Sequence, residues 1–133
     1  NPAGYTLTIK SGTSPALKAG SNSFADYTIT TSNPDYSWSI ASSSSEFGFS
    51  PEGAHITESY KDNGSLCAIG SSDTNDKCWN GFSTTAKTIA SSTSANNPTG
   101  TDTRVEFQAE VGQTATLNAG NYSAEIILTA TTI

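Results

Sequence analysis

Short stretches in which apolar and polar side chains alternate constrain the fold of this chain more than any other feature. The clearest is TRVEFQAEV at 103–111, where Val105, Phe107, Ala109 and Val111 alternate with charged or amide side chains. Successive side chains of a β-strand point to opposite faces, so this pattern predicts a strand with one face against a core.

The same period of two recurs along the chain. It appears in GYTLTIK, DYTIT, YSWSI and TATLN, and in YSAEIILTATTI, where the apolar row is Tyr122, Ala124, Ile126, Leu128 and Ala130. Shorter stretches in the middle of the chain, FGFS, AHITESY, SLCAIG, WNGFS and AKTIA, are also interpreted as strands, because Ser, Gly and Asn residues separate them.

About eight to ten short strands, separated by turn residues in this way, are typical of an antiparallel sandwich. We therefore predict an all-β fold, an antiparallel two-sheet β-sandwich of the Ig-like or jelly-roll-like kind, with residues 1–133 forming a single domain. The residues expected to form the core between the sheets are Trp38, Phe107, Tyr122, Ile126 and Leu128.

Composition agrees with this fold and excludes several functions. Ser and Thr supply about 30 per cent of the residues, which favours strands and turns over helices. Twelve acidic residues face six basic ones, a net charge of −6. No nucleic-acid partner is expected, since phosphate binding depends on clustered Lys and Arg. No stretch approaches the ~20 apolar residues of a membrane-spanning helix, so no membrane segment is expected within this chain.

The two cysteines, Cys67 and Cys78, enclose a short polar stretch. Metal-binding cysteines usually lie two to four residues apart or share further Cys and His ligands, and here His55 is the one further ligand of this kind. A structural disulfide is therefore expected, and with it an oxidising compartment outside the cell or at the cell surface. Closing this loop contributes about 3 kcal/mol in the chain-entropy treatment.

Three segments carry a resemblance: NPAGYTLTI at the start, CWNGFS in the centre, and VEFQAEVGQTATLNAGNYSAEIILTAT near the end. Together they resemble β-sandwich ectodomains of bacterial cell-surface and pilus-like envelope proteins, of the type found in ultrasmall candidate-phyla bacteria and Gram-positive envelopes. The resemblance implies an envelope, pilus-like or adhesive protein. It transfers no catalytic residue and no cofactor.

Enzymatic activity is not expected, and we predict no catalytic residue and no cofactor. His55 is the single histidine, and it lies between Glu52 and Glu58 without a strained nucleophile turn of the G-x-S-x-G kind elsewhere in the chain. His55 is interpreted as a surface strand residue. A hydrolase would instead require a concave site around it.

Oxygen ligands for a hard cation are concentrated in the cysteine loop. Asp73, Asn75 and Asp76 are weak candidates for such a site, because the loop lacks the Gly and the later Glu of a regular calcium loop. Asp and Asn are also common turn formers, so these residues are interpreted as parts of turns and no metal is predicted.

Aromatic residues outside the clean alternation offer a binding surface if they are exposed. Trp79, Phe82 and Tyr60 are the candidates, since exposed rings stack on sugars or anchor protein partners. Trp79 follows Cys78 directly, and a Trp beside a disulfide is commonly part of the core. Both interpretations remain open at this point.

The leading hypothesis is an extracellular structural or adhesive surface domain, a fibre or pilus subunit in its assembled form. Its partners are further copies or neighbouring surface-protein subunits, and the terminal segments 1–10 or 122–133 are expected to cross into or pair with the next subunit. The alternative is a module that binds a carbohydrate or a host protein through exposed aromatic loop residues.

Overall fold

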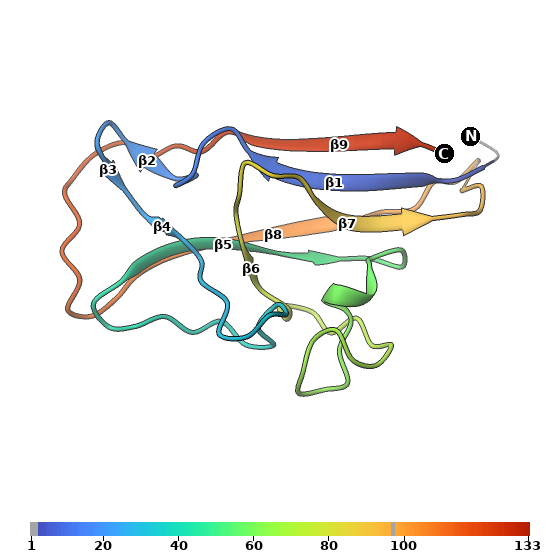
Figure 1. Ribbon diagram of the computed structural model, residues 1–133, viewed down its shortest axis with the longest axis horizontal. Coiled ribbons are helices and arrows are strands. Elements are labelled where there is room, and N and C mark those ends of the chain that lie inside the picture. The colour runs from blue at the N-terminus through green and yellow to red at the C-terminus, as the bar shows by residue number, and fades with distance from the viewer. Residues whose placement is uncertain (1–2, 97) are drawn as a thin grey trace.

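A computed structural model describes residues 3–96 and 98–133 and confirms the all-β fold (Figure 1). These residues form nine strands and one short 3-10 helix. In chain order the elements are β1 (Tyr5–Ser11), β2 (Lys18–Ala19), β3 (Asn22–Ser23), β4 (Ala25–Asp26), β5 (Ser45–Glu52), η1 (Glu58–Tyr60), β6 (Asn80–Gly81), β7 (Lys87–Ser92), β8 (Arg104–Val111) and β9 (Ile126–Thr132).

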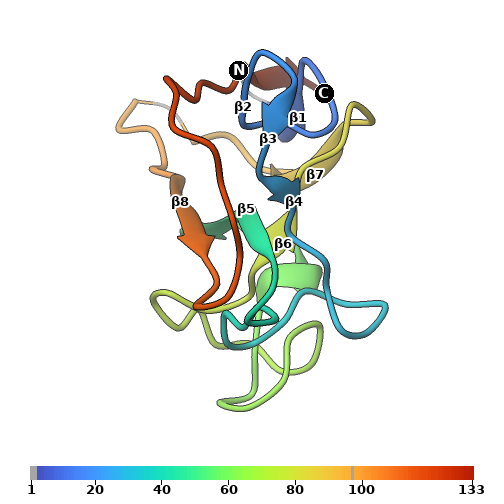
Figure 2. The same cartoon turned by 90° about the vertical axis from the view of Figure 1, so that its left-hand side faces the viewer.

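Two main sheets build a sandwich-like arrangement. The first has the order β7-β1-β9, and both of its pairings are antiparallel. The second is centred on β5, which pairs with β8 along its whole length and with the short strands β4 and β6 along part of it. Seen along the strands, the sheets approach each other where β7 lies near β4 and β6, and they diverge toward β9 and β8 (Figure 2).

Strand β5 is the most buried element of the fold, because both of its faces are covered. Seven of its eight residues are buried. The first sheet covers one face, and loops from the 27–40 and 72–79 regions cover the other. On that second face Trp38 stacks on Tyr27 at 4.3 Å between ring centroids and meets Trp79 edge-on at 5.3 Å.

Residues 36–40, predicted as a strand, form no strand in the structure. Their alternation reflects packing on the second sheet instead, since Trp38 lies on that sheet and its Nε1 donates to Glu110 Oε2 at 2.6 Å. Strand structure is likewise absent from TATLN and from most of DYTIT, AHITESY and SLCAIG, all predicted as strands, and the end of AHITESY forms η1 instead. The pairing of β4 with β5 is parallel, whereas all other named strand pairs in the described residues are antiparallel.

The core lies toward the closed side of the sandwich. Its fully buried side chains include Ile9, Phe49 and Ile89, from β1, β5 and β7. Two residues expected in the core, Phe107 and Leu128, point the predicted way but are each 50% exposed. They lie on β8 and β9, where the sheets have diverged (Figure 2), and half of each side chain remains in contact with solvent. The other expected core residues, Trp38, Tyr122 and Ile126, are partly buried.

Among the residues that the structure describes, no helix has the length and apolar character needed to cross a membrane.

Candidate functional site: the unpaired edges of β8 and β9

Strand β9 pairs with β1 on one side only. At the two ends of this ladder, Gly12 N–H donates a hydrogen bond to Glu125 O and Ile133 N–H donates one to Gly4 O, in the same register as the strand pairs. In an antiparallel ladder every second pair exchanges hydrogen bonds, so the odd-numbered residues of β9 bond to β1. The backbone groups of Ile126, Leu128, Ala130 and Thr132 therefore point away from β1, where no described strand pairs with them.

Strand β8 repeats this arrangement on the second sheet. Just beyond the paired residues of β5 and β8, Gly112 N–H donates a hydrogen bond to Ser44 O, in the same register as the strand pairs. The even-numbered residues of β8 therefore bond to β5, and the odd-numbered residues direct their N–H and C=O groups outward. Within the described parts of the chain, no strand occupies that outer edge.

The side chains above these unpaired edges are apolar and face the interior of the sandwich. Leu128 lies opposite the buried Ile9, and Phe107 lies opposite the buried Phe49. Val111, on the same face of β8, is 46% exposed. Inward-facing apolar side chains thus remain in contact with solvent. They lie along the side where the two sheets diverge (Figure 2). We call the outer edges of β8 and β9, with these side chains, the open side.

The aromatic residues proposed as a binding surface are in the core, which corrects that expectation. Trp79, Phe82 and Tyr60 are all buried. Phe82 stacks with both Phe47 and Phe107 in a cluster of three rings. The indole N–H of Trp79 donates to Asp76 O at 3.1 Å. Burial raises the pKa of Tyr60 to about 12, although the hydrogen bond that its hydroxyl receives from Asn80 acts to lower this pKa. None of the three rings is available to a ligand.

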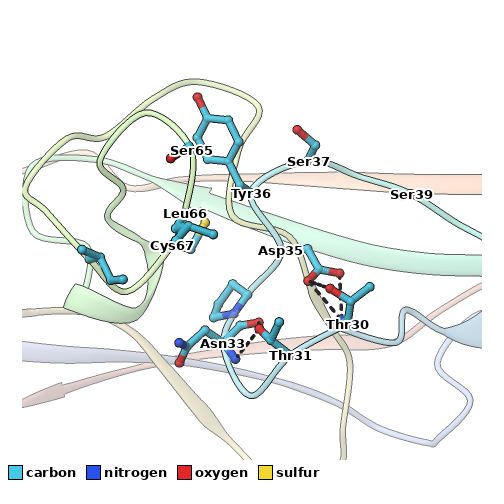
Figure 3. A pocket seen from close by; sticks show the side chains of 12 residues that line it. Thr30, Thr31, Asn33, Asp35, Tyr36, Ser37, Ser39, Ser65, Leu66 and Cys67 are labelled. Carbon is cyan, nitrogen blue, oxygen red and sulfur yellow. Dashed lines mark hydrogen bonds between the residues drawn. The ribbon is translucent and has the colours of Figure 1, made fainter.

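Cys67 and Cys78 form the expected disulfide, and an apolar surface lies next to it. Leu66 and Ile69 are exposed large hydrophobic residues of the disulfide loop. They line a cavity of about 410 Å³ together with Pro34 and Tyr36 from the loop before β5 (Figure 3).

The floor of that cavity is held by hydrogen bonds. Asp35 accepts from the backbone N–H of Thr30 at 3.0 Å and from its hydroxyl at 2.7 Å (Figure 3). Tyr27 also donates to Asp35, at 2.8 Å, and burial together with this contact raises the pKa of Tyr27. Lys77 Nζ lies over the ring of Tyr36, 4.8 Å from its centroid, so one face of this ring is occupied by a cation.

The acidic residues proposed as weak metal ligands do not converge on one point. Asp73 accepts from Gly53 N at 2.8 Å, whereas the Asp76 carboxylate lies within 4.8 Å of those of Glu52 and Glu106. Asn75 lines a shallow polar depression with Glu52 and Asp73. The trio Glu52, Asp76 and Glu106 was not predictable, because three distant segments contribute it.

Glu106 is the unusual member of this trio. A hydrogen bond with Asp76, followed by burial and the charges of Glu52 and Asp76, raises its pKa to about 7, and Arg104 opposes the rise. Arg104 lies 3.4 Å from Glu52 and 3.9 Å from Glu106. The arrangement holds a proton between neighbouring carboxylates at mildly acidic pH.

His55, interpreted as a surface strand residue, lies instead in a turn between β5 and η1 and is partly buried beside β1 and β7. Its Nδ1 is 3.1 Å from the Tyr5 hydroxyl, and its backbone carbonyl accepts from Ser91 N. Glu58 and Lys61 line the same shallow depression, but they pair with each other at 2.7 Å.

The chain matches no protein-family model, no curated protein and no solved structure. The open side is therefore interpreted from its own chemistry.

Proposed function

We propose that this chain is an extracellular structural or adhesive surface domain, without catalytic activity, which joins neighbouring subunits by strand addition at β9. A fibre or pilus-like filament is the assembled form. The disulfide between Cys67 and Cys78 supports an extracellular location, since such bonds persist in oxidising compartments.

Of the two terminal segments considered for assembly, the C-terminal one suits strand addition. Strand β1 lies between β7 and β9, so both of its edges are engaged. Strand β9 is engaged on one edge only among the described strands. Addition at β9 requires no rearrangement of the first sheet.

The observation that carries the proposal is the character of this unpaired edge. The sequence IILTATTI at 126–133 contains no charge, no Pro and no Gly. Soluble proteins usually protect an edge strand with Lys, Pro or a bulge, because unpaired backbone groups attract a further strand. An added strand from a neighbour would bond to the outward backbone groups of Leu128 and Ala130 and cover the side chain of Leu128.

The test uses proline to block one edge of β9 selectively. The N–H of Ala130 points outward, so Ala130→Pro removes a donor from the unpaired edge only. Thr129→Pro is the matched control, because its N–H faces β1 and its loss damages the fold. Sedimentation velocity and electron microscopy at rising concentration should show association of the native chain and its loss in Ala130→Pro. A native chain that stays monomeric, without filaments, rejects the proposal.

A second candidate function rests on the cavity beside the disulfide. Leu66 and Ile69 are exposed there, and aliphatic side chains favour a protein partner over a glycan, which would stack on accessible rings. Leu66→Asp should abolish binding to arrays of host proteins, whereas Ser71→Asp, at an exposed position outside the cavity lining, should not. Absence of any binding by the native chain to protein and glycan arrays rejects this function.

A further inference from the structure

Strand β8 is a second unpaired edge, and its chemistry differs from that of β9. Its outward backbone groups belong to Val105, Phe107, Ala109 and Val111, the residues whose side chains face the interior. Its opposite face carries charges of both signs, Arg104 at one end and Glu110 at the other. An edge with this pattern selects its partner by charge as well as by shape.

We propose that β8 pairs with β8 of a second copy of this chain, antiparallel, about a two-fold axis at Phe107. In this register Phe107 faces Phe107 of the second copy, and Val105 faces its Ala109. Arg104 then lies opposite Glu110 of the second copy, and the two-fold axis repeats this pair. The inference stands apart from the proposed function, because it concerns a different strand on the other sheet.

Backbone geometry limits the registers that need comparison. Directly opposed residues in an antiparallel ladder point to the same face, so inward-facing residues must oppose inward-facing ones. A two-fold axis must then pass through a residue. The registers centred on Phe107 and on Gln108 each pair seven of the eight β8 residues, and those centred on Glu106 and on Ala109 each pair five. Charged residues oppose one another in three of these registers, those centred on Glu106, on Phe107 and on Gln108.

Charge separates these three registers. Centring on Glu106 places this residue against its own copy, and centring on Gln108 places Glu106 against Glu110 twice. Like charges directly opposite each other destabilise a sheet. Centring on Phe107 is the arrangement with two Arg–Glu pairs and no opposed like charges, since Glu106 then faces the neutral Gln108.

The two charged side chains are available for these contacts. The Arg104 side chain is 67% exposed, and its distances to Glu52 and Glu106 are long for ion pairs. Glu110 is exposed and accepts the Trp38 indole N–H, and a carboxylate has room for further donors. In the proposed register, residues 104 and 110 form a non-hydrogen-bonded pair, the kind in which side chains lie closest.

The contact also covers surface that the isolated fold leaves wet. Phe107 and Val111 are half exposed on the open side, and the second copy extends the sheet beside them. A two-fold contact through β8 uses the same edge of both copies, so it joins two copies and adds no third. If β9 also pairs, each copy carries two separate contacts, one on each sheet, and alternation of the two produces an open chain.

Charge reversal and mixing test the register. Arg104→Glu alone opposes Glu to Glu110 of the second copy, and Glu110→Lys alone opposes Lys to Arg104. Each variant should dimerise at least about tenfold more weakly than the native chain in sedimentation equilibrium. An equimolar mixture of the two variants restores both opposite-charge pairs and should recover heterodimers of near-native affinity. Thermal unfolding of each variant alone checks its fold.

A cysteine variant tests the same register without altering charge. Phe107→Cys should form an intermolecular disulfide on mild oxidation, because residue 107 opposes itself, whereas Val111→Cys should not. A monomeric native chain, native-like dimerisation of the single variants, or a mixture that stays monomeric overturns the inference. Ala130→Pro should leave β8 dimers intact, so failure here and failure of the β9 proposal are distinguishable.

Discussion

Phe49 and Phe107 lie directly opposite each other on β5 and β8, yet Phe49 is fully buried whereas half of Phe107 is exposed. One step across the second sheet thus separates a closed core from solvent. The difference arises because β4, β6 and the first sheet surround Phe49, while β8 has β5 alone as a neighbouring strand among the described residues.

Truncation of these two rings should have unequal effects. Phe49→Ala should lower the free energy of unfolding by about 3–5 kcal/mol, the usual loss for a buried Phe. Phe107→Ala should lower it by about 1–2 kcal/mol, because much less of its surface leaves water on folding. Urea unfolding of both variants, measured at a concentration where the native chain is monomeric, checks the ratio. Equal losses would mean that other parts of the same chain bury Phe107 in solution.

Glu106 should make the fold less stable as the pH rises. Its folded-state pKa of about 7 lies above that of an unfolded Glu, so the folded chain binds the proton more tightly. Its stabilising contribution is complete below about pH 4.3 and is lost as the pH rises through about 7. Glu106→Gln should therefore raise the free energy of unfolding at pH 8 by about 1–2 kcal/mol, with little change at pH 4.5.

The control for this titration is Glu58→Gln. Glu58 forms an exposed pair with Lys61, so its replacement should change stability by less than about 0.5 kcal/mol at either pH. Guanidinium unfolding across pH 4.5–8 measures both variants. A Glu106→Gln variant whose stability follows the native pH profile would show that Glu52 and Asp76 do not act on Glu106.

Asp62 should have the opposite pH dependence. It is fully buried, and although burial opposes its charge, donors from Thr74 and Gly64 hold its pKa below the ordinary value. Its contribution is present above the pKa of an unfolded Asp, near about 3.9, and is lost as the pH falls through the lowered folded-state pKa.

Asp62→Asn places an amide N–H₂ against backbone donors and should cost about 1–3 kcal/mol at pH 6. The difference from the native chain should shrink below pH 3. Asp102→Asn, at an exposed position, should be neutral at both pH values. A constant difference between native chain and Asp62→Asn across pH 2–6 would contradict the role of the buried charge.

The disulfide should be the largest single contribution of the loop region. Cys67 and Cys78 are 11 residues apart, and closing a loop of this size is expected to stabilise the fold by about 3 kcal/mol. Replacement of both by Ser should lower the free energy of unfolding by about that amount. It should also expose Leu66 and Ile69 to faster proteolysis than β5, measured by limited digestion. A loss below about 1 kcal/mol would mean that hydrogen bonds to Asp62 hold the loop without the bond.

The alternation of apolar and polar residues predicts which way the side chains of β8 and β9 point, but it does not predict how deeply they are buried. In β8 and β9 every inward-facing residue points as the sequence indicates, because period two is a local property of the backbone. Whether Phe107 or Leu128 is buried depends on which strands flank them, and no local pattern contains that information. The uncharged run 126–133 was the one available signal that β9 is an edge open to pairing.

The aromatic residues of the loops show that an alternating pattern also occurs where no strand forms. Trp38 lies in a stretch whose alternation resembles a strand, but its ring packs on Tyr27 and Trp79 from a loop. Trp79 beside the disulfide is more often a core residue than a ligand-binding one, and its burial in the structure agrees with the core interpretation. The carboxylate trio around Glu106 joins residues 24 and 30 positions apart in sequence, which spacing alone cannot bring together.

The pairing of β1 with β9 links residues at opposite ends of the described chain, Tyr5 with Thr132. During synthesis β1 emerges long before β9. One edge of β1 therefore has no partner strand until the chain is nearly complete. Contacts so distant in sequence form slowly. A polypeptide halted at residue 125 would keep that edge of β1 without a partner strand, and unpaired strand edges favour aggregation.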